Sequence, residues 1–181
     1  MNELVNIKNF VTARNKKRMK MDEKLTHLDE RGQLKMVDVG GKERTERLAR
    51  VRGEIRMRVE TVRLIVENRV AKGSVLEAAR LAGIMAAKRT GELIPLCHPL
   101  NLTAVDVDFE VGEDRVRVEA RAQIEDRTGV EMEALTAAMV ALLTIYDMCK
   151  GVDRGMVISE VRLVEKRGGR SGVYVREGEE D

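Results

Sequence analysis

Alternation of apolar and polar residues predicts several strands in this chain. Residues 51–59 have apolar side chains at every second position, a period of two that is typical of a strand with one face toward solvent. The same alternation appears in residues 102–111 and 115–125, which are separated by the turn sequence Gly-Glu-Asp and are therefore expected to form a β-hairpin. Residues 156–164 predict a last strand.

Apolar residues at helical spacing predict helices between these strands. One helix is expected over residues 61–70, and a second begins after Ser74 and runs to about Lys88. Ser74 and Glu77 have the spacing of a capping box, in which each side chain caps the backbone N–H of the other residue. Residues 130–150 contain no proline and predict a third helix about 31 Å long. Acidic residues near its start and a lysine at its end suit the helix dipole.

The third helix is apolar around most of its circumference, which indicates that it packs on more than one side. Ionisable groups on so apolar a helix need partners, or their pKa values shift. The residues alone leave two interpretations open, a core helix whose acids pair with arginines or a helix that bears a functional site. At about 100° per residue, one narrow stripe of this helix contains Glu133, Thr136, Val140, Thr144 and Asp147, with Lys150 at its edge.

The predicted elements follow the order strand, one or two helices, two strands, long helix and strand. This βαββαβ order predicts an α+β fold of the ferredoxin-like type, an antiparallel sheet with helices packed on one face. The other face of the sheet and the apolar helix need more burial than one subunit offers, which favours an oligomer.

The remaining segments are expected to be less regular. Residues 25–50 predict a long loop with at most one short strand at 36–39. We expect a single domain over residues 25–172, preceded by a flexible leader over residues 1–24 and followed by a flexible C-terminal tail over residues 173–181.

Composition narrows the classes of function. The 181 residues include 33 basic and 31 acidic side chains, and aromatic residues make up only 2%. A chain that is nearly neutral and so poor in stacking side chains is not expected to bind nucleic acid. Cys97 and Cys149 are the only cysteines, and no signal peptide or membrane span is expected, so the predicted compartment is the cytoplasm. With only His27 and His98 to add, the spacings predict no zinc site.

Two short segments place reactive side chains on constrained backbone. Pro95 and Pro99 are the only prolines, and they enclose a leucine, a cysteine and a histidine at 96–98 in a stiffened turn. Lys72 lies in a glycine-flanked turn just before a predicted helix, from where a lysine can reach a ligand phosphate. The basic residues of segment 42–52 can also present cations to an anionic ligand. Each of these residues has an ordinary alternative role as solvated surface charge or as a small buried side chain.

Long stretches of the chain resemble one family closely. LIPLCHPL at 93–100, TGVEMEALTAA at 128–138 and LTIYDMCK at 143–150 are similar to the cyclic pyranopterin monophosphate synthase family, the C proteins of molybdenum cofactor biosynthesis. The shorter stretches LTHLD, MVDV, AAKRT and GGRSG fit the same family in the same order. The resemblance covers roughly residues 25–172, and unbroken motifs of this length are more specific than a short pattern.

The resemblance implies a reaction and an assembly. The family converts the cyclic dihydro-GTP intermediate (8S)-3′,8-cyclo-7,8-dihydroguanosine 5′-triphosphate into cyclic pyranopterin monophosphate with release of pyrophosphate, as a lyase of the phosphorus–oxygen type. It implies a homohexamer, a trimer of dimers, with active sites at subunit interfaces. The sequence requires no metal or other cofactor, and it leaves open whether Mg²⁺ accompanies the substrate phosphates. No nucleic acid or membrane is expected as a partner.

Motif positions that match the family imply roles for individual residues. Asp147 and Lys72 match its catalytic acid–base pair, with Lys150 beside them. His98 is expected to donate a hydrogen bond to a phosphate oxygen or to shuttle a proton. The segments that match the substrate-binding residues supply Leu96, Cys97, His98, Glu131, Met132 and Glu133.

Two other classes of function remain as alternatives. The first is a structural or regulatory oligomer that binds nucleotides without turnover, but it does not explain why ionisable groups gather on an apolar helix. The second is a thiol-dependent hydrolase that uses Cys97 with His98. Adjacent cysteine and histidine side chains point in different directions in most backbones, which weakens this second alternative.

Overall fold

Five strands and four helices make up residues 31–179, the part of the chain that the computed structural model describes. Residues 38–181 group as one unit and residues 1–37 as another. The expected leader, residues 1–24, lies outside the described residues. The elements are β1 (Thr45–Arg56), α2 (Val59–Val66), α3 (Val75–Ala87), α4 (Thr90–Leu93), β2 (Ala104–Val111), β3 (Arg115–Asp126), α5 (Glu131–Cys149), β4 (Val157–Arg167) and β5 (Tyr174–Val175).

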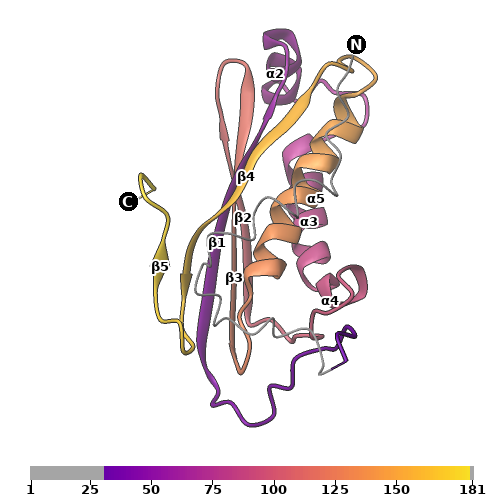
Figure 1. Cartoon of the computed structure of the whole chain (residues 1–181). Coiled ribbons are helices and arrows are strands. Elements are labelled where there is room, and N and C mark those ends of the chain that lie inside the picture. The colour runs from indigo at the N-terminus through magenta and orange to yellow at the C-terminus, as the bar shows by residue number, and fades with distance from the viewer. Residues whose placement is uncertain (1–30, 180–181) are drawn as a thin grey trace, which may run out of the picture. The chain divides into compact units, whose positions relative to one another are not determined.

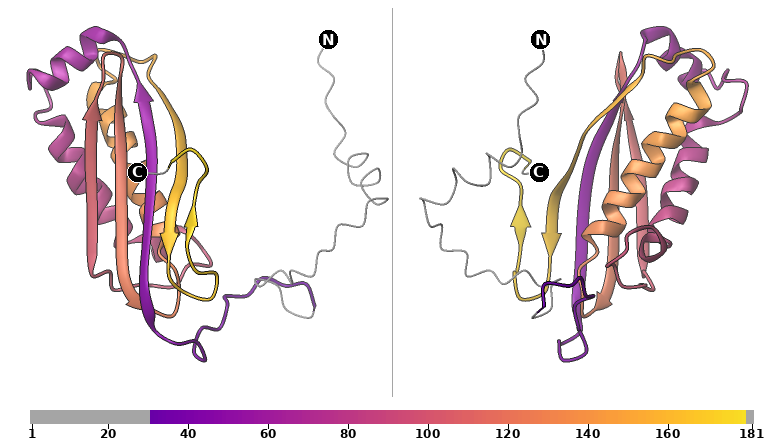
Figure 2. Two further views of the ribbon diagram at one scale, coloured as in Figure 1. Left: turned by 90° about the vertical axis from the view of Figure 1, so that its left-hand side faces the viewer. Right: turned by 45° about the vertical axis from the view of Figure 1, so that its right-hand side comes forward.

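The strands form one antiparallel sheet in the order β2-β3-β1-β4-β5. The helices α3 and α5 cover one face of this sheet (Figure 1, Figure 2). The predicted hairpin is confirmed, because the N–H of Gly112 donates to the carbonyl of Arg115 at 2.9 Å between β2 and β3. β4 is the last strand that the sequence predicted. The βαββαβ order and the α+β ferredoxin-like fold are therefore confirmed.

The core lies between the sheet and its helices. Alternate residues of β1 and β3, among them Val51 and Val118, point toward α5 and are buried. On the side of α5 that faces its neighbours, small residues such as Ala137 and Ala141 are fully buried and let α3 approach closely. By length and composition alone, α5 is the one helix of residues 31–179 that could span a membrane, and in this fold it packs against the sheet and α3.

We expect Gly83→Ala to destabilise the fold because α3 and α5 are in contact at this glycine. A Cβ at position 83 would lie 2.9 Å from the carbonyl oxygen of Ala137, a backbone atom that cannot rotate away. The two helices would have to separate, and overpacking of this kind costs roughly 1–3 kcal/mol. Thermal unfolding measures the loss. Gly151→Ala is the control, since nothing lies within 4 Å of a Cβ at that position. Equal Tm values for the two variants would contradict this prediction.

The strand β1 differs from its prediction at both ends. It begins at Thr45 instead of residue 51 and ends at Arg56 instead of residue 59. The prediction of a loop over residues 25–50 is therefore wrong from residue 45 onward, whereas residues 36–39 form no strand. The first half of β1 is mostly polar and does not alternate, but it pairs with β3 from Thr45↔Asp126 to Arg50↔Arg121. Pairing with the neighbouring strand, more than its own residue pattern, sets where β1 begins.

The helices confirm the predicted elements with two corrections. α2 ends four residues early, where Asn68 adopts a φ of 53° that a helix cannot continue. Ser74 stands at the N-cap of α3 but makes no side-chain cap hydrogen bond, so the predicted capping box is wrong. The Glu77 carboxylate lies instead 3.6 Å from Nε of Arg80, one turn further along the helix.

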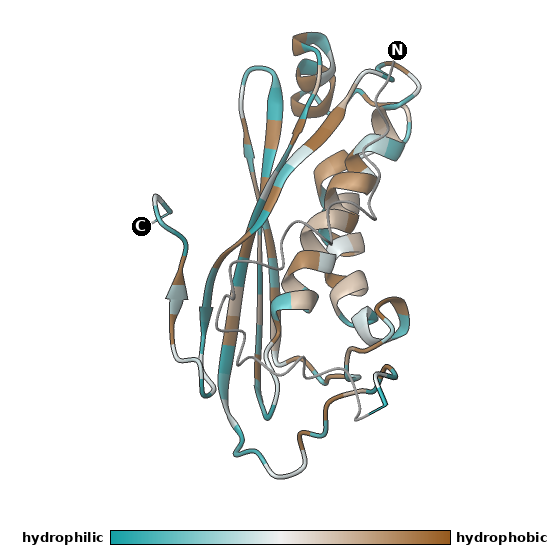
Figure 3. Ribbon diagram, in the orientation of Figure 1, coloured by the Kyte–Doolittle hydropathy of each residue, from teal (hydrophilic) through white to brown (hydrophobic). Residues whose placement is uncertain are grey.

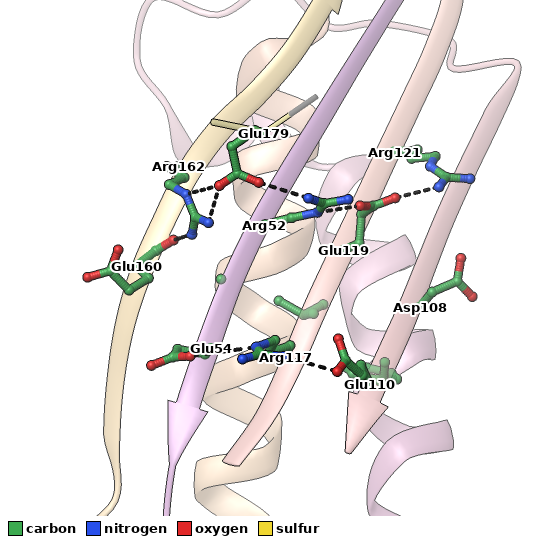
Figure 4. Close-up of a pocket in the computed structure, with 13 residues that line it drawn as sticks. Arg52, Glu54, Asp108, Glu110, Arg117, Glu119, Arg121, Glu160, Arg162 and Glu179 are labelled. Carbon is green, nitrogen blue, oxygen red and sulfur yellow. Dashed lines mark hydrogen bonds and ion pairs between the residues drawn. The ribbon is translucent and has the colours of Figure 1, made fainter. Parts of the chain in front are cut away.

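Hydrophilic and hydrophobic residues alternate along the strands (Figure 3), and charged side chains of neighbouring strands pair in ion-pair networks. Arg52 Nε lies 2.6 Å from Glu119 Oε2, and Arg52 Nη1 lies 2.8 Å from Glu179 Oε2. Glu179 also accepts a hydrogen bond from Arg162 Nε at 2.6 Å, and these groups line a hollow of about 630 Å³ (Figure 4). Residues 173–179, expected as part of a flexible tail, thus include β5 and this ion-pair network. The division into leader, domain and tail stays a prediction.

Candidate active site

Asp147 holds two lysines at the C-terminal end of α5. Its Oδ2 lies 2.8 Å from Lys72 Nζ, and its Oδ1 lies 2.7 Å from Lys150 Nζ. Lys72 also donates to the backbone carbonyl of Asp147 at 2.9 Å. All three side chains are about half exposed. The structure therefore brings together three of the four residues expected to be catalytic, whereas the fourth, His98, lies beside Gly91 of α4.

Local structure explains how Lys72 reaches α5. The segment after α2 is closed by hydrogen bonds from Arg69 N to Leu64 O at 2.9 Å and from Gly73 N to Val70 O at 3.0 Å. Gly73 has a φ of +96°, a conformation that strains any residue with a Cβ, and it turns the chain into α3. The turn leaves Lys72 beside the last turn of α5.

The lysines change the acidity of this group. Hydrogen bonds from Lys150 and Lys72 lower the pKa of Asp147 to about 2, and the hydrogen bond with Asp147 raises the pKa of Lys150. The carboxylate is therefore ionised throughout the neutral range and is a weak base. Its chemical use is to hold two ammonium groups as proton donors and as positive charge.

A second group of expected site residues lies at the N-terminal end of α5. Glu133 is only 3% exposed, and burial raises the pKa of its carboxyl to about 7, with the charge of Glu131 adding to the shift. Cys97 follows α4, which contacts α5, and burial and the charge of Glu133 raise the pKa of its thiol. Leu96, Cys97, His98, Glu131 and Met132 are all half-buried.

A basic hollow of about 700 Å³ adjoins the same end of α5. Glu131 forms part of its wall. Gly169 has a φ of +73°, and the Arg47 guanidinium lies directly over it, in space that a Cβ would occupy. Such a hollow can bind a polyanion, because guanidinium and ammonium groups form charge-assisted hydrogen bonds with phosphate. The cations along its wall are Lys42, Arg47, Arg127, Lys166, Arg167 and Arg170.

The two groups lie at opposite ends of one helix. Glu133 and Asp147 are 14 positions apart in the sequence, which corresponds to about 21 Å along α5. In Figure 1, the start of α5 lies near α4, whereas its end lies near the α2–α3 connection that bears Lys72. The side chains of one subunit therefore cannot act on the same atom of a ligand from both ends.

Sequence reasoning missed part of the basic hollow. Segment 42–52 was expected to present cations, but only Lys42 and Arg47 line the hollow, whereas Arg50 lies 3.3 Å from Glu165 and Arg52 pairs with Glu119. The other four cations come from Arg127 and the segment 166–170. The glycine-rich motif GGRSG was the available signal, since glycines beside cations are common where backbone approaches a phosphate. Within residues 31–179, no three His, Cys, Asp or Glu side chains are grouped to hold a metal ion.

Comparisons with known proteins agree on one family. The model of the MoaC family matches residues 36–169. A protein of Pelotomaculum thermopropionicum is 64% identical over 158 residues, which cover 86% of this chain and 93% of that protein. Proteins of Thermomicrobium roseum and Novosphingobium aromaticivorans are 60% and 61% identical, over 86% and 83% of this chain and 95% and 96% of their own lengths. All three are named cyclic pyranopterin monophosphate synthase. With most of its length matched by the family model and by these relatives, the chain belongs to the MoaC family.

Proposed function

We propose that this chain is a lyase of molybdenum cofactor biosynthesis. Its substrate is (8S)-3′,8-cyclo-7,8-dihydroguanosine 5′-triphosphate, and its products are cyclic pyranopterin monophosphate and pyrophosphate. The observation that carries the proposal is the placement of Lys72 and Lys150 on the two oxygens of Asp147, in a chain that belongs to the MoaC family.

The proton chemistry of this reaction divides between the two ends of α5. A reduced imidazole ring opens and a pterin ring closes, so protons must move on and off nitrogen and carbon. Asp147 is too weak a base for this, and it positions Lys72 and Lys150 as proton donors. Glu133, with a pKa of about 7, can accept and return a proton near neutral pH.

The basic hollow is the proposed site of the triphosphate. Loss of pyrophosphate places negative charge on the leaving group, and fixed cations stabilise that charge without reorganising. Lys166 near the end of β4 and Arg170 from the β4–β5 connection line the hollow together with Lys42 and Arg127. His98, whose backbone lies beside Gly91 of α4, is a further candidate donor to a phosphate oxygen. No resident metal or cofactor is part of this proposal, and Mg²⁺ enters only with the substrate phosphates.

Two subunits form each proposed active site. Because Asp147, which holds the lysines, lies about 21 Å along α5 from Glu133, and the hollow adjoins the Glu133 end of the helix, a partner subunit has to bring its hollow to the lysines. An exposed stripe on α5 supports this contact: Met139 and Leu143 are 39% and 51% exposed and lead directly to Asp147 and Lys150. In a homohexamer built as a trimer of such dimers, each active site receives the lysines of one subunit and the basic hollow of another.

The two cysteines are relevant to the compartment of the protein and to the alternative of a thiol-dependent hydrolase. Cys97 and Cys149 are both free, which suits the reducing cytoplasm that we propose for this enzyme. A thiol hydrolase needs a cysteine whose pKa is lowered. The pKa of Cys97 is raised instead, so the geometry favours proton transfer by lysine and glutamate.

Turnover of the cyclic dihydro-GTP intermediate tests the proposed function. We expect the purified wild-type protein to release pyrophosphate and to form an equal molar amount of pterin product, measured by its fluorescence after oxidation. Tight binding of the intermediate without either product would support a regulatory nucleotide-binding protein. Absence of binding would overturn the proposed function.

A further inference from the structure

We propose that Asp153 is a positioning residue that keeps Lys72 on Asp147 by joining the start of α2 to the end of α5. This inference rests on the proposed function, which assigns Lys72 and Asp147 to the reaction. Asp153 itself lies behind these two residues, and its carboxylate accepts hydrogen bonds from other groups.

Asp153 is a buried carboxylate with a full set of donors. It is 5% exposed, and its Oδ2 accepts hydrogen bonds from Arg58 N at 2.9 Å and from the Thr61 hydroxyl at 3.1 Å. Its Oδ1 accepts a hydrogen bond from Gly155 N at 3.1 Å. Burial opposes ionisation, but these donors outweigh it and lower the pKa of Asp153. Such a group is anchored firmly, because any displacement leaves a buried charge without partners.

These bonds connect two elements that are distant in the sequence. The helix α2 has Arg58 at its N-cap position and no side-chain cap of its own, so Asp153 supplies the acceptor that this helix end needs. Asp153 lies four residues after Cys149, the last residue of α5, and its own N–H donates to the carbonyl of Cys149 at 3.0 Å. One carboxylate thus fixes the start of α2 against the end of α5.

The position of α2 determines the position of Lys72. The segment between them, residues 67–72, is closed by local hydrogen bonds and so moves with the helix. Both the anchor and the lysine bond to backbone carbonyls at the end of α5, since Asp153 N donates to Cys149 O at 3.0 Å and Lys72 Nζ donates to Asp147 O at 2.9 Å. A displaced α2 would therefore carry Lys72 away from Asp147.

The Lys72–Asp147 pair cannot hold this geometry by itself. Both side chains are about half exposed, and ion pairs on a surface stabilise by only about 0–1 kcal/mol. The fully bonded Asp153 is the stronger constraint. Its effect on the reaction is indirect, since a misplacement of about 1 Å at a catalytic group is enough to slow a reaction by about 100-fold.

The test compares kcat of the full-length wild type, Asp153→Asn and Thr61→Val. Asparagine has a single acceptor oxygen, so one of the three donors loses its partner. We expect kcat to fall about 100-fold for Asp153→Asn and about 10-fold for Thr61→Val, with KM little changed. Thr61→Val keeps the side-chain shape and removes only the hydroxyl that donates to Asp153. It therefore tests the proposal even if Asp153→Asn fails to fold. Gly83→Ala is the control, because it lowers stability in the α3–α5 contact far from this anchor.

A mutant cycle separates positioning from general destabilisation. In a Lys72→Ala background, Asp153→Asn is expected to cause no further loss of kcat, because the residue that it positions is gone. Two results would overturn the proposal. The first is that Asp153→Asn lowers kcat by the same factor in the Lys72→Ala background as in the wild type. The second is that Asp153→Asn alone lowers kcat no more than Gly83→Ala does.

The proposal can also be decided without turnover. If the wild type has no activity on the intermediate, the proposed function fails, and titration of the Asp147 carboxyl by carbon-13 NMR still tests the anchor. Its pKa is expected to rise in Asp153→Asn, since Lys72 leaves, and to stay near its wild-type value in Gly83→Ala. An unchanged Asp147 pKa in Asp153→Asn would overturn the proposal.

Discussion

Replacing Asp147 by asparagine is expected to lower kcat by about 10²–10⁴-fold, because the two lysines that it positions no longer act as proton donors. Lys72 and Lys150 both lose the charge that holds them, at 2.8 Å and 2.7 Å from the carboxylate oxygens. Folding should be little affected, since all three side chains are half exposed and such pairs add little stability. Steady-state kinetics on the cyclic dihydro-GTP intermediate, together with thermal unfolding, measures both effects.

A matched control for this variant exists in the hairpin turn between β2 and β3. Asp114 is also about half exposed and paired with a cation, at 2.7 Å from Arg115 Nε, and this pairing likewise lowers its pKa. Asp114→Asn removes a similar ion pair that includes neither Lys72 nor Lys150, so kcat should stay at the wild-type value. If Asp147→Asn were as active as Asp114→Asn, the role of Asp147 would be refuted.

The second large effect is expected for Glu133→Gln. We expect kcat to fall by about 100-fold or more and the dependence on a group with a pKa near 7 to disappear from the pH profile. Wild-type kcat/KM should rise with pH as the Glu133 carboxyl, with its pKa of about 7, loses its proton and becomes a base. Rates measured from pH 5 to pH 9 test this, with Glu113→Gln, at the exposed hairpin turn, as control. A profile that is identical in wild type and Glu133→Gln would exclude Glu133 as the titrating group.

The same residue makes stability depend on pH in a defined direction. The carboxyl of Glu133 has a pKa of about 7 when folded and an ordinary value of 4.5. As pH rises between these values, the unfolded state loses the proton first, so the free energy of unfolding decreases by up to about 3 kcal/mol. Glu133→Gln should remove this decrease. Denaturant unfolding at pH 4.5 and pH 7.5 compares the two proteins.

The elements with a clear residue period could be predicted, and those formed by tertiary contact could not. The β2–β3 hairpin and α5 follow from alternation and from a long apolar run without proline. The first half of β1 is polar and becomes a strand only through its pairing with β3. Glu77 and Arg80 form a local i,i+3 pair within α3, but the Ser-x-x-Glu spacing alone cannot show that Glu77 makes this pair instead of capping the helix.

The site was predictable from the residues only in part. The stripe on α5 contains both Glu133 and Asp147, but helical spacing cannot show that one becomes buried and the other pairs with two lysines. Lys72 is 75 positions from Asp147, so only the family resemblance connected them before the structure was known. The basic hollow draws its cations from three separate segments, and no single segment is basic enough to reveal it.

The central claim is that two subunits complete each active site from opposite ends of α5. Lys72→Ala and Glu133→Gln are each expected to keep only about 1% or less of wild-type kcat, because each removes one half of every site. When the two variants are coexpressed with different tags and assembled together, a site that pairs the intact halves of two chains can form. For random two-fold pairing at equal amounts, about one quarter of the sites should be intact.

The decisive measurement is therefore the turnover of this mixed assembly. We expect about one quarter of wild-type activity for Lys72→Ala with Glu133→Gln. A mixture of Lys72→Ala with Asp147→Asn, which damage the same end of α5, should remain inactive and serves as control. If the first mixture were as inactive as each variant alone, the two ends of α5 could not belong to one site shared between subunits, and the central claim would be contradicted.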